Sequence, residues 1–265
     1  MRVVIKVGTS TLTYPTGRLN IRRVEALCKA LSDWKNAGHE VIFVSSGAIA
    51  MGVGKLNLTE RPKDIPSKQA AAAVGQCELM YTYDKLFSEY NHTVAQILLT
   101  GEDLRDEKRR RNFVNTLLRL LELDALPVIN ENDTISTEEF GVGDNDTLAA
   151  LVAVSIQAET LILLSDIDGL YTADPRRDPA ARLIPEVRDL TPEILSSGGG
   201  QGSAFGTGGM ATKLSAAGIC MEHGTDMLIV NGERPELLYQ ILDGKAAGTR
   251  FLAAREANRG GISHA

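Results

Sequence analysis

Short polar segments, most of them containing glycine, follow apolar runs or begin helical patterns along this chain. Lysines lie near the two ends of this series, at Lys6 and Lys213. Hydroxyls, amides and carboxylates lie between them, in segments 8–10, 45–48, 130–133, 141–146, 165–169 and 206–212. Lysine supplies a compact positive charge for phosphate oxygens, and glycine turns and helix N-termini offer backbone N–H groups to an anion. The set indicates a site that holds a polyphosphate and a polar second substrate.

Each segment has a simpler interpretation by itself, because Ser-Ser-Gly and Asn-Glu-Asn-Asp are ordinary turn and cap sequences. Their repeated position just after predicted strands favours one shared site. The chain has no G-x-x-x-x-G-K-[ST] motif, which argues against a P-loop enzyme. Segment 206–211 matches G-x-G-x-x-A, with Asp226 further along. A dinucleotide fingerprint must follow a strand, however, and residues 196–205 do not have a strand pattern.

Histidine and cysteine give no sign of a metal or disulfide site. The histidines are scattered and no two cysteines form a C-x-x-C pair: His39, His92, His223 and His264; Cys28, Cys77 and Cys220. We therefore predict no protein-ligated metal, and cysteines that pack as small apolar residues. The basic run 108–111 follows several acids, which is more typical of a solvated helix face than of a nucleic-acid contact.

The elements that must position the polar segments alternate between strands and helices. Apolar runs predict strands at 3–7, 41–45, 93–99, 126–130, 160–165 and 227–230. Helical patterns occupy 20–37, capped by Asn20, and 67–90, opened by Ser67, then 106–123, 146–157, 209–223 and 235–242. This order predicts an α/β fold whose parallel sheet is covered on both faces. The strand ends then meet at one edge, where such sheets bind ligands.

Length and charge limit the function classes. A chain of 265 residues suits one large domain. A net charge of −6 argues against binding nucleic acid or an anionic membrane. The N-terminus lacks the layout of a signal peptide, and no apolar run is long enough to span a membrane. We therefore expect a cytoplasmic protein. The glycine-rich segment 196–209 is predicted to be a mobile loop that orders over a nucleotide.

The polar segments together resemble the glutamate 5-kinase branch of the amino acid kinase family. The similarity lies in 4–10, 44–49, 128–133, 142–146, 165–176 and 206–214, and it extends from Val3 to about Phe251. It implies a three-layer αβα sandwich with a mainly parallel central sheet, with a kinase domain at 1–252 and a flexible tail at 253–265. The implied reaction transfers the γ-phosphoryl group of ATP to the side-chain carboxylate of L-glutamate. Its product, glutamyl 5-phosphate, is the first intermediate of proline biosynthesis.

The resemblance also implies residue roles. Lys6 and Lys213 correspond to the lysines that stabilise the moving phosphoryl group, and Asp146, which lies beside the implied glutamate site, is the third catalytic residue. The implied ATP site comprises Lys6, Ser165, Asp166, Thr207, Gly208, Gly209, Met210, Ala211, Thr212 and Lys213, and the implied glutamate site comprises Ser46, Asp133 and Asn145. A carboxylate with a pKa of about 4.3 is already ionised at neutral pH, so the reaction needs no general base. Asp146 and Asp166 would then orient the lysines or the substrate ammonium group.

ATP is the implied co-substrate, with Mg²⁺ held mainly by its phosphates. The resemblance further implies proline as a competing feedback inhibitor, a glutamyl phosphate reductase that receives the product, and a homo-oligomer. Segment 134–142 is expected to be an exposed flap that affects proline sensitivity. Many relatives carry a second, C-terminal domain of the PUA type, whereas this chain stops at Ala265. We therefore expect a kinase domain alone.

Two alternatives stay open at this point. One is a family member that acts on a different carboxylate, carbamate or phosphate acceptor. The other is a non-catalytic ligand sensor on the same fold. The lysine pair favours an enzyme, because binding alone does not require two charges placed to stabilise a transferring phosphoryl group.

Overall fold

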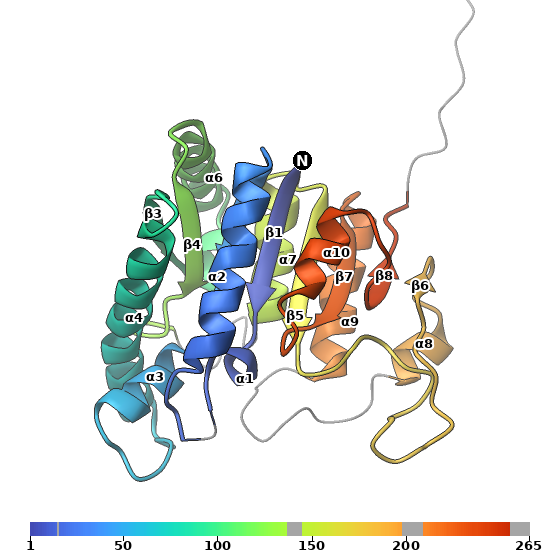
Figure 1. Ribbon diagram of the computed structural model, residues 1–265, viewed down its shortest axis with the longest axis horizontal. Helices are drawn as coiled ribbons and strands as arrows, with labels where there is room; N and C mark the ends of the chain where they lie inside the picture. Colours follow the sequence, from blue (N-terminus) through green and yellow to red (C-terminus); the bar gives the residue numbers. More distant parts are fainter. Residues whose placement is uncertain (15, 137–144, 198–208, 255–265) are drawn as a thin grey trace, which may run out of the picture.

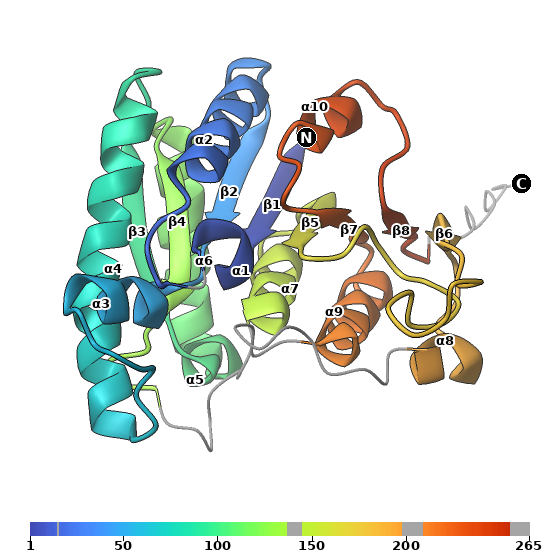
Figure 2. The ribbon, with the colours of Figure 1, turned by 60° about the horizontal axis from the view of Figure 1, so that its bottom comes forward.

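The computed structural model describes residues 1–14, 16–136, 145–197 and 209–254. Within these ranges one sheet has the strand order β3-β4-β2-β1-β5-β7-β8-β6 (Figures 1 and 2). The strands are β1 (Arg2–Val7), β2 (Glu40–Val44), β3 (Val94–Leu99), β4 (Leu126–Glu131), β5 (Thr160–Ser165), β6 (Glu186–Val187), β7 (Asp226–Asn231) and β8 (Thr249–Phe251). All neighbours are parallel except β7 and β8. The predicted mainly parallel sheet is confirmed.

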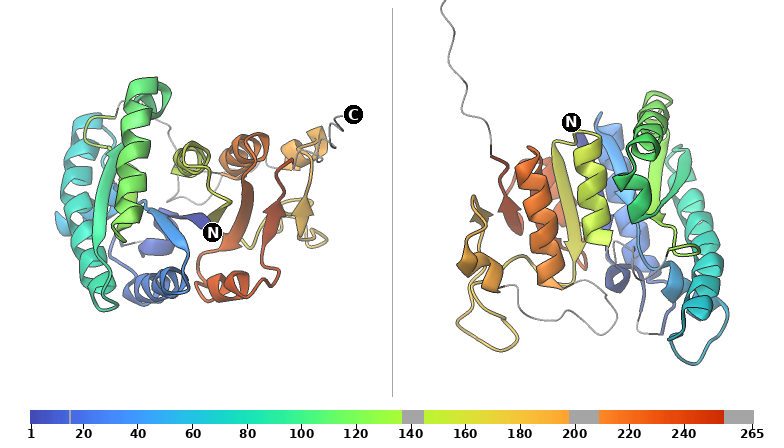
Figure 3. Two further views of the ribbon diagram at one scale, coloured as in Figure 1. Left: turned by 90° about the horizontal axis from the view of Figure 1, so that it is seen from above. Right: turned by 180° about the vertical axis from the view of Figure 1, so that it is seen from behind.

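Helices cover both faces of this sheet, which gives the three layers that the resemblance implied (Figure 3). One face is covered by α2 (Ile21–Asn36), α4 (Ile65–Ser88) and α10 (Leu237–Leu242), and the other by α6 (Glu107–Glu122), α7 (Asn145–Ser155) and α9 (Met210–Glu222). Shorter helices connect these elements: α1 (Thr9–Leu12), α3 (Ala48–Lys55), α5 (Gly101–Arg105) and α8 (Pro192–Ser197).

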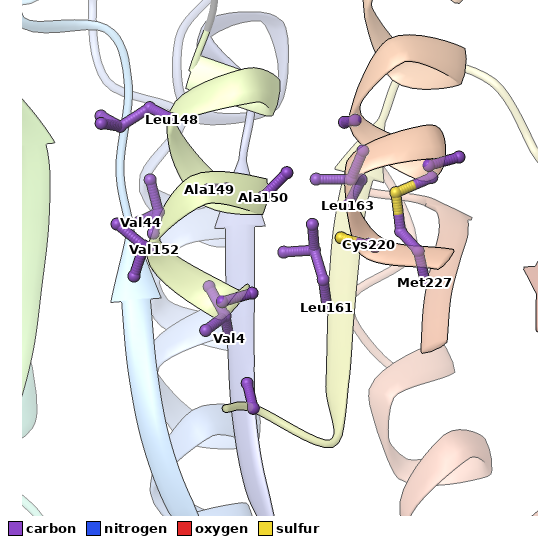
Figure 4. Close-up of a cluster of buried hydrophobic side chains, with 14 of the residues drawn as sticks. Val4, Val44, Leu148, Ala149, Ala150, Val152, Leu161, Leu163, Cys220 and Met227 are labelled. Atoms are coloured by element: carbon purple, nitrogen blue, oxygen red, sulfur yellow. The ribbon is translucent and has the colours of Figure 1, made fainter. Parts of the chain in front are cut away.

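The apolar strands are continuous because both of their faces are buried. In β1, Val4 packs under α7, whereas its neighbours Val3 and Ile5 face the opposite core. Figure 4 shows Val4 and Leu161 against the small residues of α7. All six residues of β5 are buried, as a strand at the centre of a parallel sheet requires. This packing fixes the strand register, and so it fixes which residues reach the carboxyl edge.

Helix starts follow their capping residues, and one of them differs from the sequence prediction. Asn20 caps α2 as expected, since its side-chain oxygen accepts from the Arg23 N–H at 3.3 Å. The expected opening of α4 at Ser67 is wrong. Asp64 is the cap, accepting from the Ser67 N–H at 2.9 Å, and Pro66 lies in the first turn. Proline suits that turn because its missing N–H would have no helical partner there.

Helices α3 and α4 cross at two glycines. A Cβ atom on Gly75 would lie 1.7 Å from the Ala48 carbonyl oxygen, and one on Gly52 would lie 1.8 Å from that of Ala71. No larger residue fits at either position without moving a helix. This contact holds α4 firmly beside the segment that follows β2.

Three further sequence predictions have mixed outcomes. Cys28 and Cys220 are buried as expected, but Cys77 is exposed, because it lies on the outer side of α4. No described helix is both long enough and apolar enough to cross a membrane. Residues 198–208 and 255–265 lie outside the described ranges, so the mobile loop and the flexible tail stay predictions.

Candidate active site

The carboxyl edge of the sheet gathers polar side chains in an otherwise apolar interior. Seven of them are less than a tenth exposed: Lys6, Ser45, Ser46, Asn130, Asp146, Ser165 and Lys213. They come from β1, β4, β5 and α9, from the turn after β2, and from the first turn of α7. Buried polar groups are costly unless they are paired. Their concentration at one edge therefore marks a functional site.

Asp146 joins the two lysines predicted from the sequence. Its carboxylate accepts from the Lys6 ammonium group through Oδ1, and from Lys213 Nζ through Oδ2 at 2.9 Å. Thr212 Oγ1 lies 3.4 Å from the same Oδ2. Two ammonium groups and one carboxylate leave a net positive charge in a desolvated place. Such a charge favours an anionic ligand or transition state.

The charge of Asp146 is secured by these partners. Burial alone would raise the pKa of this carboxyl, since it is only 1% exposed. The charges of Lys6 and Lys213, and the hydrogen bonds from both, outweigh burial and hold the pKa of Asp146 well below its usual range. Asp146 is therefore ionised at neutral pH. It cannot act as a general acid, and its geometry suits orienting the lysines.

Asn145 precedes Asp146 and reaches the other half of the site. Its Nδ2 donates to the Ser45 carbonyl oxygen at 2.7 Å, to Ser46 Oγ at 2.8 Å and to Asn130 Oδ1 at 2.9 Å. The structure thus brings Ser46 and Asn145 together, as the resemblance implied. This half is held by neutral amide and hydroxyl groups.

Asp133 lies in the turn after β4 and makes no hydrogen bond to Ser46 or Asn145 among the described residues. Burial, with the nearby charge of Glu131, raises its pKa to about 6, and Arg61 opposes this shift. Asp133 and Glu131 make this side of the site acidic, which suits a ligand carrying an ammonium group.

The residues expected to hold ATP lie at the carboxyl end of β5 and at the start of α9. Ser165 Oγ donates to Asp166 Oδ1 at 3.2 Å, and Arg176 Nη2 lies 3.6 Å from Asp166 Oδ2. Gly209 is the N-cap of α9, and its N–H and those of Met210, Ala211 and Thr212 belong to the unpaired first turn of that helix. Thr207 and Gly208 lie outside the described residues. No group of three or more His, Cys, Asp or Glu side chains in the described ranges could hold a metal ion.

The sequence predictions did not include the layer beneath the amide half. Asn130 Nδ2 donates to Gln76 Oε1 at 2.8 Å, and the Tyr83 and Ser45 hydroxyls are 2.8 Å apart. Gln76 and Tyr83 both lie on the buried stripe of α4. A lone glutamine on an apolar helix stripe was the signal that could have identified this layer.

Comparison with known proteins defines the class. The profile of the Amino acid kinase family matches residues 1–231, and the chain belongs to this family. Carbamate kinase from Giardia lamblia bound to AMP-PNP has a TM-score of 0.66 at 17% identity, covering 95% of this chain and 98% of that one. The product complex of T. acidophilum isopentenyl phosphate kinase has a TM-score of 0.61 at 17% identity, covering 95% and 100%. At such low identity these structures support the fold alone.

Curated relatives narrow the class to one enzyme. The glutamate 5-kinase of Clostridium perfringens is 52% identical over 258 residues, which is 96% of each chain. Those of Clostridium tetani and Listeria innocua are 53% and 50% identical, covering 96% of this chain and 95% and 94% of theirs. The resemblance seen in the motifs is confirmed.

Proposed function

We propose that this protein is a glutamate 5-kinase, which transfers the γ-phosphoryl group of ATP to the side-chain carboxylate of L-glutamate. Curated glutamate 5-kinases are 50–53% identical in sequence to this chain over nearly its full length, which supports this activity. The structural observation that carries it is the Lys6–Asp146–Lys213 cluster beside a neutral amide cluster. One half suits phosphate and the other suits an amino acid.

We assign the phosphate side to Lys6, Lys213 and the first turn of α9. An acceptor carboxylate is already a nucleophile at neutral pH, so the enzyme must position two anions and stabilise charge on the moving phosphoryl group. The lysine pair supplies that charge, and Asp146 keeps both ammonium groups aimed at one place. Ser165 and Asp166, with the residues that lead into α9, would hold the nucleotide.

Mg²⁺ would supply further positive charge on the ATP phosphates. On the phosphate side the described carboxylates are already engaged, Asp146 with the lysines and Asp166 with Ser165 and Arg176. This donor set fits a cation carried mainly by the phosphates rather than one held in a protein cage.

We assign the acceptor side to Ser46, Asp133 and Asn145. The acidic surroundings of Asp133 suit the α-ammonium group of glutamate, and the lysine pair suits its side-chain carboxylate. Proline also carries an amine and a carboxylate, so it would compete for the same contacts. Residues 137–142 of the expected flap lie outside the described ranges, and its control of proline sensitivity is part of this proposal. Delivery of the product to a glutamyl phosphate reductase and self-association complete it.

The activity is tested by ADP release from the purified protein with ATP, Mg²⁺ and a panel of acceptors. The panel contains glutamate, aspartate, carbamate and a phosphate monoester. Turnover highest with glutamate is the expected result, and turnover no higher than with the other acceptors would refute the proposal. Initial rates against glutamate at several proline concentrations then test competition. Inhibition that glutamate cannot relieve would argue against a shared site.

A further inference from the structure

The amide half of the site is extended inward by Gln76. This side chain is 9% exposed on the face of α4 that packs on the sheet, one residue after the close crossing at Gly75. Its Oε1 accepts from Asn130 Nδ2 at 2.8 Å, and Asn130 Oδ1 accepts from Asn145 Nδ2 at 2.9 Å. Three amide groups therefore form a chain from the helix to the predicted substrate contact.

Backbone groups fix the direction of this chain. The Glu131 N–H donates to Asn130 Oδ1 at 2.9 Å, and a backbone N–H can only donate. At the far end, the Ser45 carbonyl oxygen accepts from Asn145 at 2.7 Å, and a carbonyl can only accept. Both asparagine amides are thereby oriented without ambiguity between nitrogen and oxygen. The Asn130 amino group must then point to Gln76, which has to present oxygen.

This orientation decides what Asn145 offers a ligand. Its two N–H bonds serve three protein acceptors, at 2.7, 2.8 and 2.9 Å. Its Oδ1 has no hydrogen-bond partner among the described residues. The side chain thus presents an acceptor, which pairs with an ammonium group and repels a carboxylate.

We propose that Gln76 is a positioning residue that makes the enzyme selective for an acceptor bearing an α-ammonium group. It acts through Asn130 and Asn145 and does not touch the substrate. Without an acceptor at position 76, the buried Asn130 amino group has no hydrogen-bond partner. A rotation of the Asn130 side chain that gives this group another partner then becomes favourable. Asn145 would then lose the contact that holds its oxygen toward the ligand. This inference rests on the proposed function.

The test compares glutamate with glutarate, the same dicarboxylate without the amino group, as acceptors in the ADP-release assay. Gln76→Met keeps size but removes the acceptor, and Gln76→Glu keeps an acceptor oxygen. Leu79→Met is the control on the same helix stripe, because it exchanges one apolar side chain for another of similar size. In Gln76→Met we expect KM for glutamate to rise about tenfold, with kcat nearly kept and glutarate little affected. The preference for glutamate should therefore fall. Gln76→Glu should retain it, and Leu79→Met should leave it unchanged.

Several outcomes would overturn the inference. An unchanged preference in Gln76→Met does so, and so does an equal loss for both acceptors, which would indicate a merely structural role. Loss of the preference for glutamate over glutarate in Gln76→Glu would also overturn the inference. If Gln76→Met does not fold, Gln76→Asn, whose oxygen is withdrawn by one methylene, must show the same fall. A wild-type enzyme that does not phosphorylate glutamate refutes the proposed function itself, and this inference with it.

Discussion

The two halves of the candidate active site are joined at consecutive residues of α7, yet they are built by opposite means. Asp146 holds two ammonium groups in a buried cluster of full charges. Asn145 holds a chain of neutral amides and a hydroxyl. A charge acts over several ångströms and tolerates small displacements, whereas a hydrogen bond depends on direction. We therefore expect the charged half to govern rate and the amide half to govern affinity and selectivity.

Asp146→Asn should have the largest effect, because it removes the buried carboxylate that pairs with both Lys6 and Lys213. Removing one partner of a buried ion pair typically costs about 3–5 kcal/mol. We expect this loss in urea unfolding at pH 7.5, together with a large fall in kcat. Asp124→Asn is the control, since Asp124 pairs with Lys35 while itself being 89% exposed, where about 1 kcal/mol or less is typical. Equal destabilisation by both variants would contradict the role of Asp146.

Lys6→Ala and Lys213→Ala come next and test the rate half directly. Loss of one group that stabilises transition-state charge typically lowers kcat by about 10²–10³-fold. We expect that fall, with KM for glutamate changed far less. Lys35→Ala is the matched control, because its side chain is also mostly covered and paired with an aspartate, outside the site. Near-normal kcat in either active-site variant would show that the lysine is misassigned.

Asn145→Ala should show the opposite signature, since it removes the neutral half and leaves Asp146 in place. We expect KM for glutamate to rise about 10- to 100-fold and kcat at saturation to change less. Steady-state kinetics with saturating ATP measure both. A fall in kcat larger than the rise in KM would contradict the assignment of rate to the charged half and affinity to the amide half.

Asp133 should give the smallest effect and one that depends on pH. Its pKa in the folded protein is about 6, above the usual value of about 4. As the pH rises, the Asp133 carboxyl therefore ionises in the unfolded chain before it ionises in the folded protein. Ionisation therefore lowers stability as the pH rises from about 4 to 6, and the loss is complete above that. Asp133→Asn should raise Tm more at pH 7.5 than at pH 5, while weakening glutamate binding at pH 7.5. Wild-type KM for glutamate should also rise below about pH 6. A Tm difference independent of pH would contradict the raised pKa.

The sequence was sufficient to predict six of the eight strands of the described sheet, and to single out the two lysines of the charged half. Continuous apolar runs identify buried parallel strands. Polar residues at the ends of these runs are conspicuous because burying a charged group is costly unless it is paired. Lys6 and Lys213 are conspicuous in this way. Their shared contact with Asp146 depends on the tertiary structure and cannot be predicted from sequence spacing alone.

The amide layer was harder to predict because neutral groups carry a weak sequence signal. Gln76 lies in an alanine-rich helix, where glutamine is an ordinary helix former. Only the contact with Asn130 gives it significance. The start of α4 was missed for a related reason, since Asp64 and Ser67 are both acceptable caps. The antiparallel β8 is three residues long, too short for a reliable pattern.

The order of strands in the sheet also determines when the enzyme can form during synthesis. The central strand β1 is made first, but one of its two partners, β5, is made much later. Until β5 has left the ribosome, β1 has an open apolar edge, the kind of surface that aggregates or attracts chaperones. Lys6 is among the first residues made, whereas Lys213 must wait for α9. The cluster of Lys6, Asp146 and Lys213 therefore forms only after most of the chain has been made, with β7, α10 and β8 still to follow. Nascent chains that lack α9 also lack the proposed phosphate side of the site.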